Sequence, residues 1–313
     1  MVAVSTARAY RSAMTPSSLL AAAPWWRPNT GRFLVIRGGR PLAGTYPISG
    51  AKNAILPLMV AALLTPHLVT LRNVPGNLDV AVLAALLQRL GCEMNWSHRT
   101  DGLAATISAD RLRPADIDPD LVSRMRASVL LLGALLARCG EARLPLPGGD
   151  AIGLRGIDFH LAGLRAMGAT IVLDGGTIEA TARDGLHGAE ILLPTPSVGA
   201  TENLMLAAVL ASGRTTIRNA ACEPEVADLA ACLAAMGATI EGIGTRQLAI
   251  EGALLAAPSI RCCPTASSSA RWPAPRRRPA AVSCCRTAAS PCWARLGPSM
   301  RPPASLSTKP RRA

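Results

Sequence analysis

Lysine and aromatic residues are scarce in this chain. Of its 33 Lys and Arg residues only Lys52 and Lys309 are lysines, and aromatic residues make up 3% of the 313 positions. Single-stranded nucleic acid is bound largely by stacking bases on aromatic side chains. The lack of aromatics therefore argues against a nucleic-acid-binding function, and Lys52 is the only lysine outside the last residues of the chain.

Acidic residues are missing from both ends. Residues 1–32 contain four Arg, and residues 258–313 contain ten Arg and one Lys, with no Asp or Glu in either segment. The intervening residues 33–257 carry 18 cations against 20 acids, so the net charge of +13 belongs to the ends. An Arg-rich tail that binds nucleic acid stays an alternative, but total charge gives it little support.

Paired cysteine motifs and long apolar runs are also missing. None of the nine Cys residues forms a CxxC pair, which argues against a zinc site. The longest largely apolar run, Ala127–Ala137, falls well short of the ~20 residues that a membrane-spanning helix needs. We expect no metal, no cofactor and no membrane insertion.

Composition divides the chain into three parts. Residues 1–32 are rich in Ala, Ser, Arg and Pro and are predicted to be a disordered extension, with a targeting segment as the alternative. A short strand, Phe33–Ile36, opens a folded domain predicted at 33–257. Residues 258–313 have no apolar period and are predicted to be disordered.

The folded part contains an internal repeat of roughly 70 residues. Gly91, Gly168 and Gly237 each follow an amphipathic helix and precede a strand. Glycine just past a helix is the expected C-terminal stop. Strands Val69–Asn73 and Thr215–Asn219 occupy matching positions. We predict three copies of a βαβαββ-like unit in one α/β domain.

Each repeat also contains a helix that is apolar on nearly all sides: Ile55–Leu64, Val129–Ala137 and Leu204–Ala211. Such helices must be buried, and they are expected to pack against each other at the domain centre. The chain leading into the three helices holds Lys52 and Asn53, Arg124 and Arg126, and the segment 197–201, respectively.

Parallel packing would bring three positive helix ends and several cations to one pocket. That arrangement suits a substrate with several phosphates or carboxylates. Two plainer alternatives stay open, namely that Lys52 is a solvated surface lysine and that Arg126 forms a structural ion pair.

The segment 144–158 contains two Pro and the pair Gly148-Gly149, which predicts a mobile loop. Asp150 near its tip is either the cap of the following turn or a general acid on a closing loop.

Taken together, these motifs resemble the UDP-N-acetylglucosamine 1-carboxyvinyltransferase family over roughly residues 33–257. The matching text is Ser49-Gly50-Ala51-Lys52-Asn53-Ala54, Met125-Arg126-Ala127-Ser128, Leu146 to Gly153 with Arg155, Ser197 to Asn203 and Glu223-Pro224-Glu225. The resemblance implies an inside-out α/β barrel fold, of which this chain would hold one complete three-repeat domain and lack the second. It also implies a bacterial, cytoplasmic enzyme of peptidoglycan synthesis without a cofactor.

The resemblance further implies the reaction and the site. Phosphoenolpyruvate would donate its enolpyruvyl group to the 3′-hydroxyl of UDP-N-acetylglucosamine, with release of phosphate. Asp150, Lys52 and Arg126 would be catalytic, Asp150 standing where most members have Cys. Substrate would be bound by Lys52, Asn53, Arg126, Arg155, Gly156, Ile157, Asp158, Phe159, Thr195, Pro196, Ser197, Val198 and Gly199.

Two further functions stay open. The family's second domain has no counterpart after about residue 260, where the text reads as an out-of-frame replacement. An inactive fragment that keeps some UDP-sugar binding is therefore an alternative. A 5-enolpyruvylshikimate-3-phosphate synthase-like enzyme is another, because it shares the fold and the chemistry.

Overall fold

The computed structural model describes residues 48–100, 102–113, 117–149, 156–253, 255 and 259–261. From Ser49 onward these residues belong to one compact unit. The extension 1–32, the strand predicted at Phe33–Ile36, the tip of the predicted loop and residues 262–313 lie outside the described residues. The three-part division of the chain therefore stays a prediction.

Three successive segments share one order of elements, namely a helix, a strand, a second helix and a hairpin. The first has α2 (Lys52–Ala61), β1 (Val69–Val74), α3 (Leu78–Arg89), β2 (Glu93–Arg99) and β3 (Gly102–Ser108), with the 3-10 turn η1 (Ala62–Leu64) after α2. The second has α4 (Pro119–Ser123), η2 (Arg126–Val129), α5 (Leu130–Cys139), β4 (Glu141–Pro145), α6 (Asp158–Ala166), β5 (Thr170–Asp174) and β6 (Thr177–Thr181). The third has β7 (Glu190–Leu192), α7 (Val198–Ala208), β8 (Arg214–Arg218), α8 (Pro224–Ala235), β9 (Thr239–Glu241) and β10 (Gln247–Glu251), and β11 (Ser259–Arg261) follows. The predicted threefold repeat is confirmed.

The sheets repeat as well. Their strand orders are β11-β1-β3-β2, β4-β6-β5 and β7-β8-β10-β9, with the second hairpin strand antiparallel to both of its neighbours in each. Strand β11 pairs parallel with β1, as β7 pairs parallel with β8. The last described strand therefore completes the sheet of the first repeat, although it begins just past the boundary predicted at residue 257.

The glycines predicted as helix stops all have left-handed backbones. Gly91, Gly168 and Gly237 have φ values of 93°, 96° and 115°. At each, the glycine N–H and the next N–H donate to carbonyls of the last helical turn, as in Gly91 to Gln88 and Cys92 to Leu87. Left-handed geometry strains any residue with a Cβ atom. The glycine prediction is therefore confirmed in all three repeats.

Asparagine serves the same purpose where two strands end. Asn73, the penultimate residue of β1, and Asn219, directly after β8, both have φ of 58°. Asn tolerates this conformation because its short amide can hydrogen-bond locally. The Asn219 side chain donates to the Leu193 carbonyl and accepts from Arg246.

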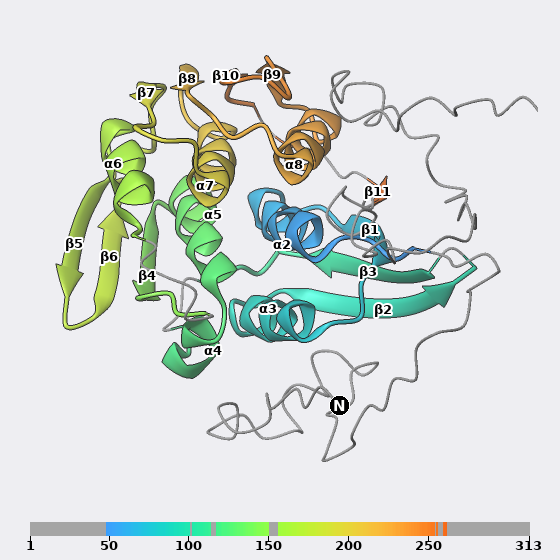
Figure 1. Cartoon of the computed structure of the whole chain (residues 1–313). Coiled ribbons are helices and arrows are strands. Elements are labelled where there is room, and N and C mark those ends of the chain that lie inside the picture. The colour runs from blue at the N-terminus through green and yellow to red at the C-terminus, as the bar shows by residue number, and fades with distance from the viewer. Residues whose placement is uncertain are drawn as a thin grey trace, which may run out of the picture. The chain divides into compact units, whose positions relative to one another are not determined.

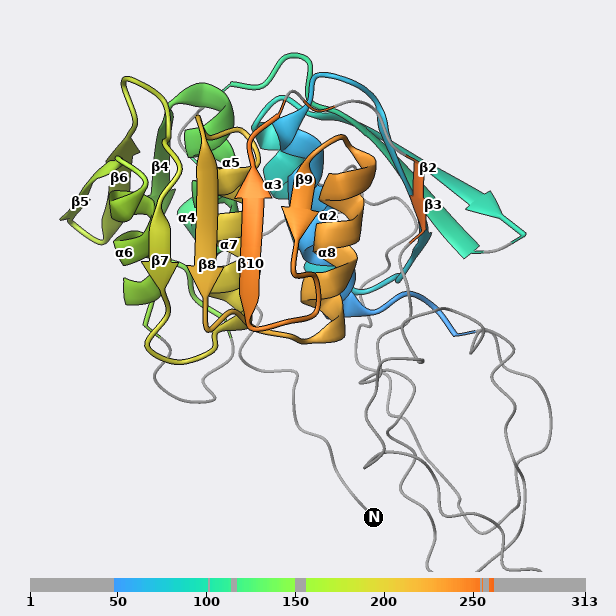
Figure 2. The same ribbon diagram turned by 90° about the horizontal axis from the view of Figure 1, so that it is seen from above.

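Helices lie inside and sheets outside in the described part of the chain (Figure 1). Helix α5 packs against α7 and α2, and α2 also packs against α3 and α8. Figure 2 shows the sheet β7-β8-β10-β9 lying over α7 and α8. Every residue of the stretches 54–61, 130–136 and 200–208 is buried, so the all-round burial predicted for the three apolar helices is confirmed.

Some predicted element bounds were wrong. The third apolar helix starts at Val198 rather than Leu204, because Ser197 caps it by accepting the N–H of Ala200 at 3.3 Å. The predicted loop 144–158 begins inside strand β4 and ends inside helix α6. Strand pairing of Leu144 and Pro145 with β6 outweighs the turn preference of the Pro and Gly residues around them.

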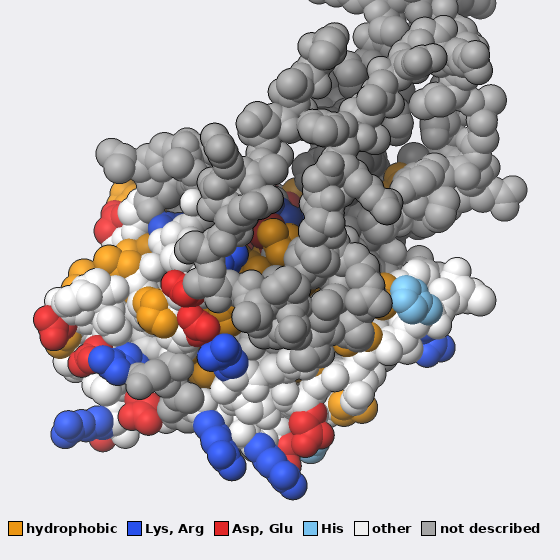
Figure 3. Space-filling model, turned by 90° about the horizontal axis from the view of Figure 1, so that it is seen from below, with side chains coloured by type: hydrophobic (Ala, Val, Ile, Leu, Met, Phe, Trp, Pro, Cys, Tyr) orange, Lys and Arg blue, Asp and Glu red, His pale blue; other side chains and the backbone are white. Residues whose placement is uncertain are grey.

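Charges are mixed on the described surface. On the face in Figure 3, acidic and basic side chains are interspersed rather than gathered by sign. This agrees with the near balance of charges counted over residues 33–257. Within the part of the chain that is described, no helix has the length and hydropathy needed to cross a membrane.

Candidate functional site

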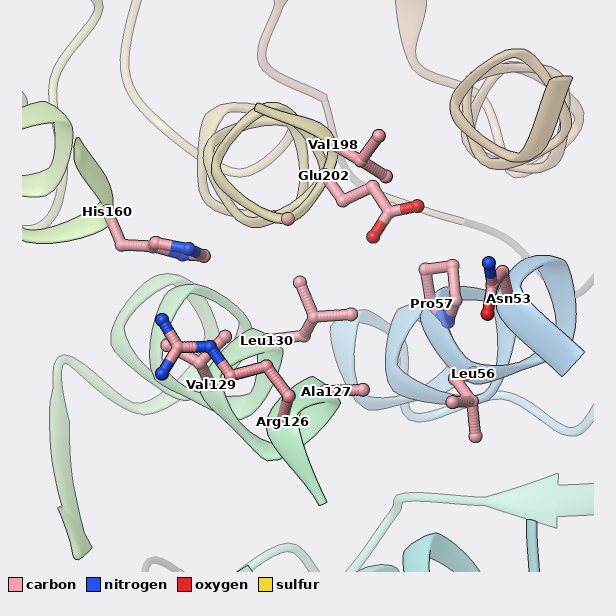
Figure 4. A pocket seen from close by; sticks show the side chains of 11 residues that line it. Asn53, Leu56, Pro57, Arg126, Ala127, Val129, Leu130, His160, Val198 and Glu202 are labelled. Atoms are coloured by element: carbon pink, nitrogen blue, oxygen red, sulfur yellow. The ribbon is translucent and has the colours of Figure 1, made fainter. Parts of the chain in front are cut away.

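A pocket of about 140 Å³ lies where the first turns of α2, α5 and α7 meet. Figure 4 shows these helices nearly end-on around it, with His160 of α6 at one side. Asn53, Leu56, Pro57, Arg126, Ala127, Val129, Leu130, His160, Val198, Gly199 and Glu202 line it. The predicted convergence of three helix starts on one pocket is confirmed, but of the cations predicted there only Arg126 is among the lining residues.

Lys52 does not line this pocket. Its Nζ lies 2.6 Å from Oδ2 of Asp79 at the start of α3, and its side chain is 51% exposed. Successive residues of a helix are turned by about 100°, so Asn53 faces the pocket while Lys52 faces α3. Contact of Lys52 with a substrate stays a prediction. An anionic substrate would have to compete with the Asp79 carboxylate for the Lys52 ammonium.

Arg126 lies on the pocket wall in η2. Its Nη2 donates to the carbonyl of Gly156 at 2.6 Å, and Figure 4 shows the guanidinium directed towards His160. The bond joins the pocket to the segment predicted to bind uridine. A guanidinium presents five N–H donors in a planar fork, a geometry that matches the oxygens of a phosphate or carboxylate.

Asn203 holds His160 in one orientation. The Asn203 Oδ1 accepts the Gly133 N–H at 3.0 Å, which places Nδ2 3.1 Å from Nδ1 of His160. Nδ1 therefore accepts, and the proton of a neutral ring is on Nε2. Burial, followed by the charge of Arg126, lowers the pKa of His160 to about 4, so the ring is neutral near pH 7.

An acidic group occupies the other end of the pocket. Glu202 is only 4% exposed, and within the described residues its Oε1 has no hydrogen-bond partner. The neighbouring Glu225 accepts from Nδ2 of Asn53 at 3.4 Å. Burial is the first cause that raises the pKa of Glu202 well above 4.5, and the charges of Glu225 and Glu223 add to it.

The segment predicted to bind uridine lies beside the pocket. Gly156 and Asp158 are exposed, and Ile157 and Phe159 are half-buried at the start of α6. The residues found to line the pocket include none of these four. Asp150 and Arg155 lie outside the described residues, so their roles stay predictions.

The predicted nucleotide-binding residues at the start of α7 are divided. Val198 and Gly199 line the pocket, whereas Thr195 and Pro196 are exposed and Ser197 caps the helix. Gly199 allows close approach, since a Cβ atom there would lie 3.3 Å from Cε1 of His160.

Two polar lining residues, His160 and Glu202, were missed by the sequence-based site. Glu202 had a detectable signal, because it is the one acid in the apolar helix 198–208 and lies three residues after Gly199, on the same face. His160 directly follows the predicted uridine segment, but nothing in its sequence context indicated a buried ring. Among the described residues no cluster of His, Cys, Asp or Glu could hold a metal ion.

Comparison with known proteins defines the class. The family model of EPSP synthase (3-phosphoshikimate 1-carboxyvinyltransferase) matches residues 36–274. The chain belongs to this family. Its fold is that of the enolpyruvyl transferases: NikO of Streptomyces tendae aligns with a TM-score of 0.63 and 26% identity, covering 74% of this chain and 54% of that one. EPSP synthase of Acinetobacter baumannii, at 18% identity and a TM-score of 0.55, shares the fold.

Within that class, several similar curated relatives carry one name. A UDP-N-acetylglucosamine 1-carboxyvinyltransferase of Granulibacter bethesdensis is 55% identical over 218 residues, which cover 69% of this chain and 51% of the relative. One of Rhodospirillum centenum is 53% identical over 226 residues, covering 70% and 52%. The chain thus spans about half the length of the curated relatives it matches.

Proposed function

We propose that this chain contributes to transfer of the enolpyruvyl group from phosphoenolpyruvate to the 3′-hydroxyl of UDP-N-acetylglucosamine, with release of phosphate. The product would serve peptidoglycan synthesis in a bacterial cytoplasm. One observation carries the proposal: the first turns of three repeated helices meet at a single pocket that holds Arg126 and Asn53. The 55% identity to a relative of that name favours this substrate pair.

The proposed binding follows from charge. Both substrates are anionic, and the N-terminal ends of α2 and α7 carry partial positive charge from unpaired N–H groups. Arg126, which lines the pocket, would bind a phosphate or carboxylate through its guanidinium. Asn53, Val198 and Gly199 would line the substrate beside it.

Three residues that are not among the described residues lining the pocket also have roles in this proposal. Asp150 would protonate the methylene carbon of the enol as positive charge develops on the adjacent carbon. Arg155 with the segment 156–159 would hold the uridine. Lys52 would meet the phosphoenolpyruvate only after its ion pair with Asp79 opens.

A second candidate is binding of the nucleotide sugar without turnover. It is favoured by the position of Lys52, which forms an ion pair with Asp79 and does not line the pocket. A third candidate is use of shikimate 3-phosphate as the acceptor, which the description of the matching family favours.

Calorimetry and a phosphate-release assay separate the three. Full-length protein is titrated with UDP-N-acetylglucosamine and with shikimate 3-phosphate, and then each acceptor is supplied with phosphoenolpyruvate. We expect binding of the nucleotide sugar and loss of about tenfold in affinity in Arg126→Ala, since a charged hydrogen bond contributes about 1.5 kcal/mol or more. Arg218→Ala, at an exposed position of β8, is the matched control.

Phosphate release with the nucleotide sugar would establish turnover. Binding without release would favour the second candidate, and binding of shikimate 3-phosphate instead would favour the third. Failure to bind either acceptor would overturn the proposal.

A further inference from the structure

Glu202 is a buried polar group that the fold itself does not satisfy. It lies one turn into α7, with 4% of its surface exposed, and it lines the pocket. Its Oε1 is buried and has no hydrogen-bond partner among the described residues. A buried carboxyl oxygen without a partner costs free energy, because its lost contact with water is not replaced. The cost is explained if a ligand supplies the partner.

The two polar ends of the pocket differ in charge. Figure 4 shows the Arg126 guanidinium pointing towards His160, and the Glu202 carboxyl pointing towards α2, where Asn53 and Pro57 lie. Arg126 is the one cation among the residues that line the pocket. An anionic ligand group is therefore attracted to one end, and the other end needs a different chemistry.

Like charges surround Glu202. Glu225 and Glu223, at the start of α8, both raise its pKa, and Asn53 donates its Nδ2 hydrogen to Glu225 rather than to Glu202. These acids repel phosphate and carboxylate groups. A protonated carboxyl group has one donor and one acceptor, which match the hydroxyl and amide groups of a sugar.

The size of the pocket also limits what enters. Its 140 Å³ is below the roughly 300–1,000 Å³ of sites that enclose drug-sized ligands. One sugar-sized portion of a nucleotide sugar can therefore occupy it, with the remainder outside.

We propose that Glu202 is a specificity-determining residue that hydrogen-bonds a neutral oxygen-bearing group of the substrate's sugar, while Arg126 holds an anionic group of the same complex. This inference rests on the proposed function. Glu202 would then distinguish a nucleotide sugar from the bare nucleotide. The anionic group of the ligand would lie at the α6 end of the pocket, and the sugar at the α2 end.

The test compares two ligands and two substitutions. Calorimetry at pH 7 measures the affinity of the full chain for UDP-N-acetylglucosamine and for UDP. Glu202→Gln keeps a hydrogen-bond donor and an acceptor in a side chain of the same shape, so the affinity ratio of the two ligands should stay within about twofold of wild type. Glu202→Leu keeps the approximate volume without hydrogen bonding, so that ratio should fall about tenfold or more while UDP binding is unchanged. Glu179→Leu, at an exposed position of β6, is the matched control, and thermal melting verifies that each variant folds.

Each other outcome counts against the inference. An unchanged ratio in Glu202→Leu would show that the sugar does not contact this side chain. An equal loss in Glu202→Gln and Glu202→Leu would show that an ionised carboxylate is needed. Wild-type protein that binds UDP and the nucleotide sugar equally overturns the role of Glu202 but leaves nucleotide binding intact. If it binds neither, the proposed function fails as well.

Discussion

The two ends of the pocket differ in how their buried polar atoms are partnered. At the α5–α6–α7 end, Asn203 links Gly133 to His160 through two hydrogen bonds of 3.0 and 3.1 Å. At the α2–α7–α8 end, Glu202 has an oxygen with no partner among the described residues, and two acids act on it. Both ends are built on α7, from adjacent positions of the sequence.

The difference separates a structural role from a functional one. Asn203 is fully buried and fixes how α5, α6 and α7 approach, so its hydrogen bonds stabilise the fold without a ligand. The buried Glu202 oxygen without a partner lowers the stability of the fold instead. Proteins keep such groups mainly where a ligand or a reaction requires them.

The largest expected effect on stability comes from disrupting the hydrogen bonds of Asn203 at the α5–α6–α7 end of the pocket. In Gly133→Ala, the new Cβ would lie 2.5 Å from both the carbonyl oxygen and Oδ1 of Asn203. Overpacking of up to about 3 kcal/mol and a lost hydrogen bond of about 1 kcal/mol exceed the gain in helix propensity of about 1 kcal/mol. Urea unfolding should show a loss of about 3 kcal/mol.

Gly163→Ala is the control for that substitution. Its new Cβ would meet the flexible end of the Leu204 side chain rather than backbone, so a smaller loss is expected. Equal losses in the two variants would contradict a special role for the Gly133–Asn203 contact.

Low pH should lower the stability of the fold at the α5–α6–α7 end of the pocket, because His160 becomes protonated. Its folded pKa of about 4 lies below its ordinary value of 6.5, so the unfolded chain takes up the proton first as the pH falls. Stability is therefore lost between about pH 6.5 and 4, by about 2 kcal/mol from this residue between pH 7 and pH 5.

Urea unfolding at pH 7 and pH 5 measures this dependence. His160→Gln should remove about 2 kcal/mol of the difference, and His187→Gln, at an exposed position, should leave it unchanged. A wild-type pH dependence in His160→Gln would rule out the buried neutral ring as its cause.

Replacing the Glu202 carboxyl group with a neutral amide is expected to stabilise the protein. The pKa of Glu202 is raised in the fold, so its ionised form costs stability as the pH rises above 4.5. Glu202→Gln should therefore gain on the order of 1 kcal/mol at pH 8, and the gain should shrink at pH 4. Exposed Glu179→Gln should change stability by less than about 0.5 kcal/mol. A loss of stability in Glu202→Gln at pH 8 would refute this account.

The smallest effect is expected away from both ends. The Lys52–Asp79 ion pair is at the surface, where such pairs contribute about 0–1 kcal/mol and are screened by salt. Asp79→Asn should therefore change the free energy of unfolding by less than about 1 kcal/mol, with a smaller change in 1 M salt. A larger loss in the free energy of unfolding that does not depend on salt would contradict the assignment of this ion pair to the surface.

Much of the fold could be predicted because its signals are local. Gly91, Gly168 and Gly237 indicate helix ends through backbone geometry that depends on neighbouring residues alone. Nearly continuous apolar runs located the central helices. The start of α7 was missed by one to two turns because Ser197 caps it, and the pairing of β11 with β1 joins residues far apart in the sequence.

The site was predicted less completely than the fold. Asn53, Arg126, Val198 and Gly199 lie in quoted motifs and line the pocket. The placement of Lys52 towards Asp79 depends on how α2 packs against α3, which no local pattern encodes.

The sequence by itself determined the threefold repeat, the helix stops and the burial of the three apolar helices, because side-chain periodicity and backbone preference act over a few residues. Tertiary structure alone decided which side chains of those helices share a pocket. The rotation of each helix about its axis is set by contacts such as Gly133 with Asn203, between residues far apart in the chain. That rotation turns His160 and Glu202 to opposite ends of one pocket and keeps Lys52 outside it.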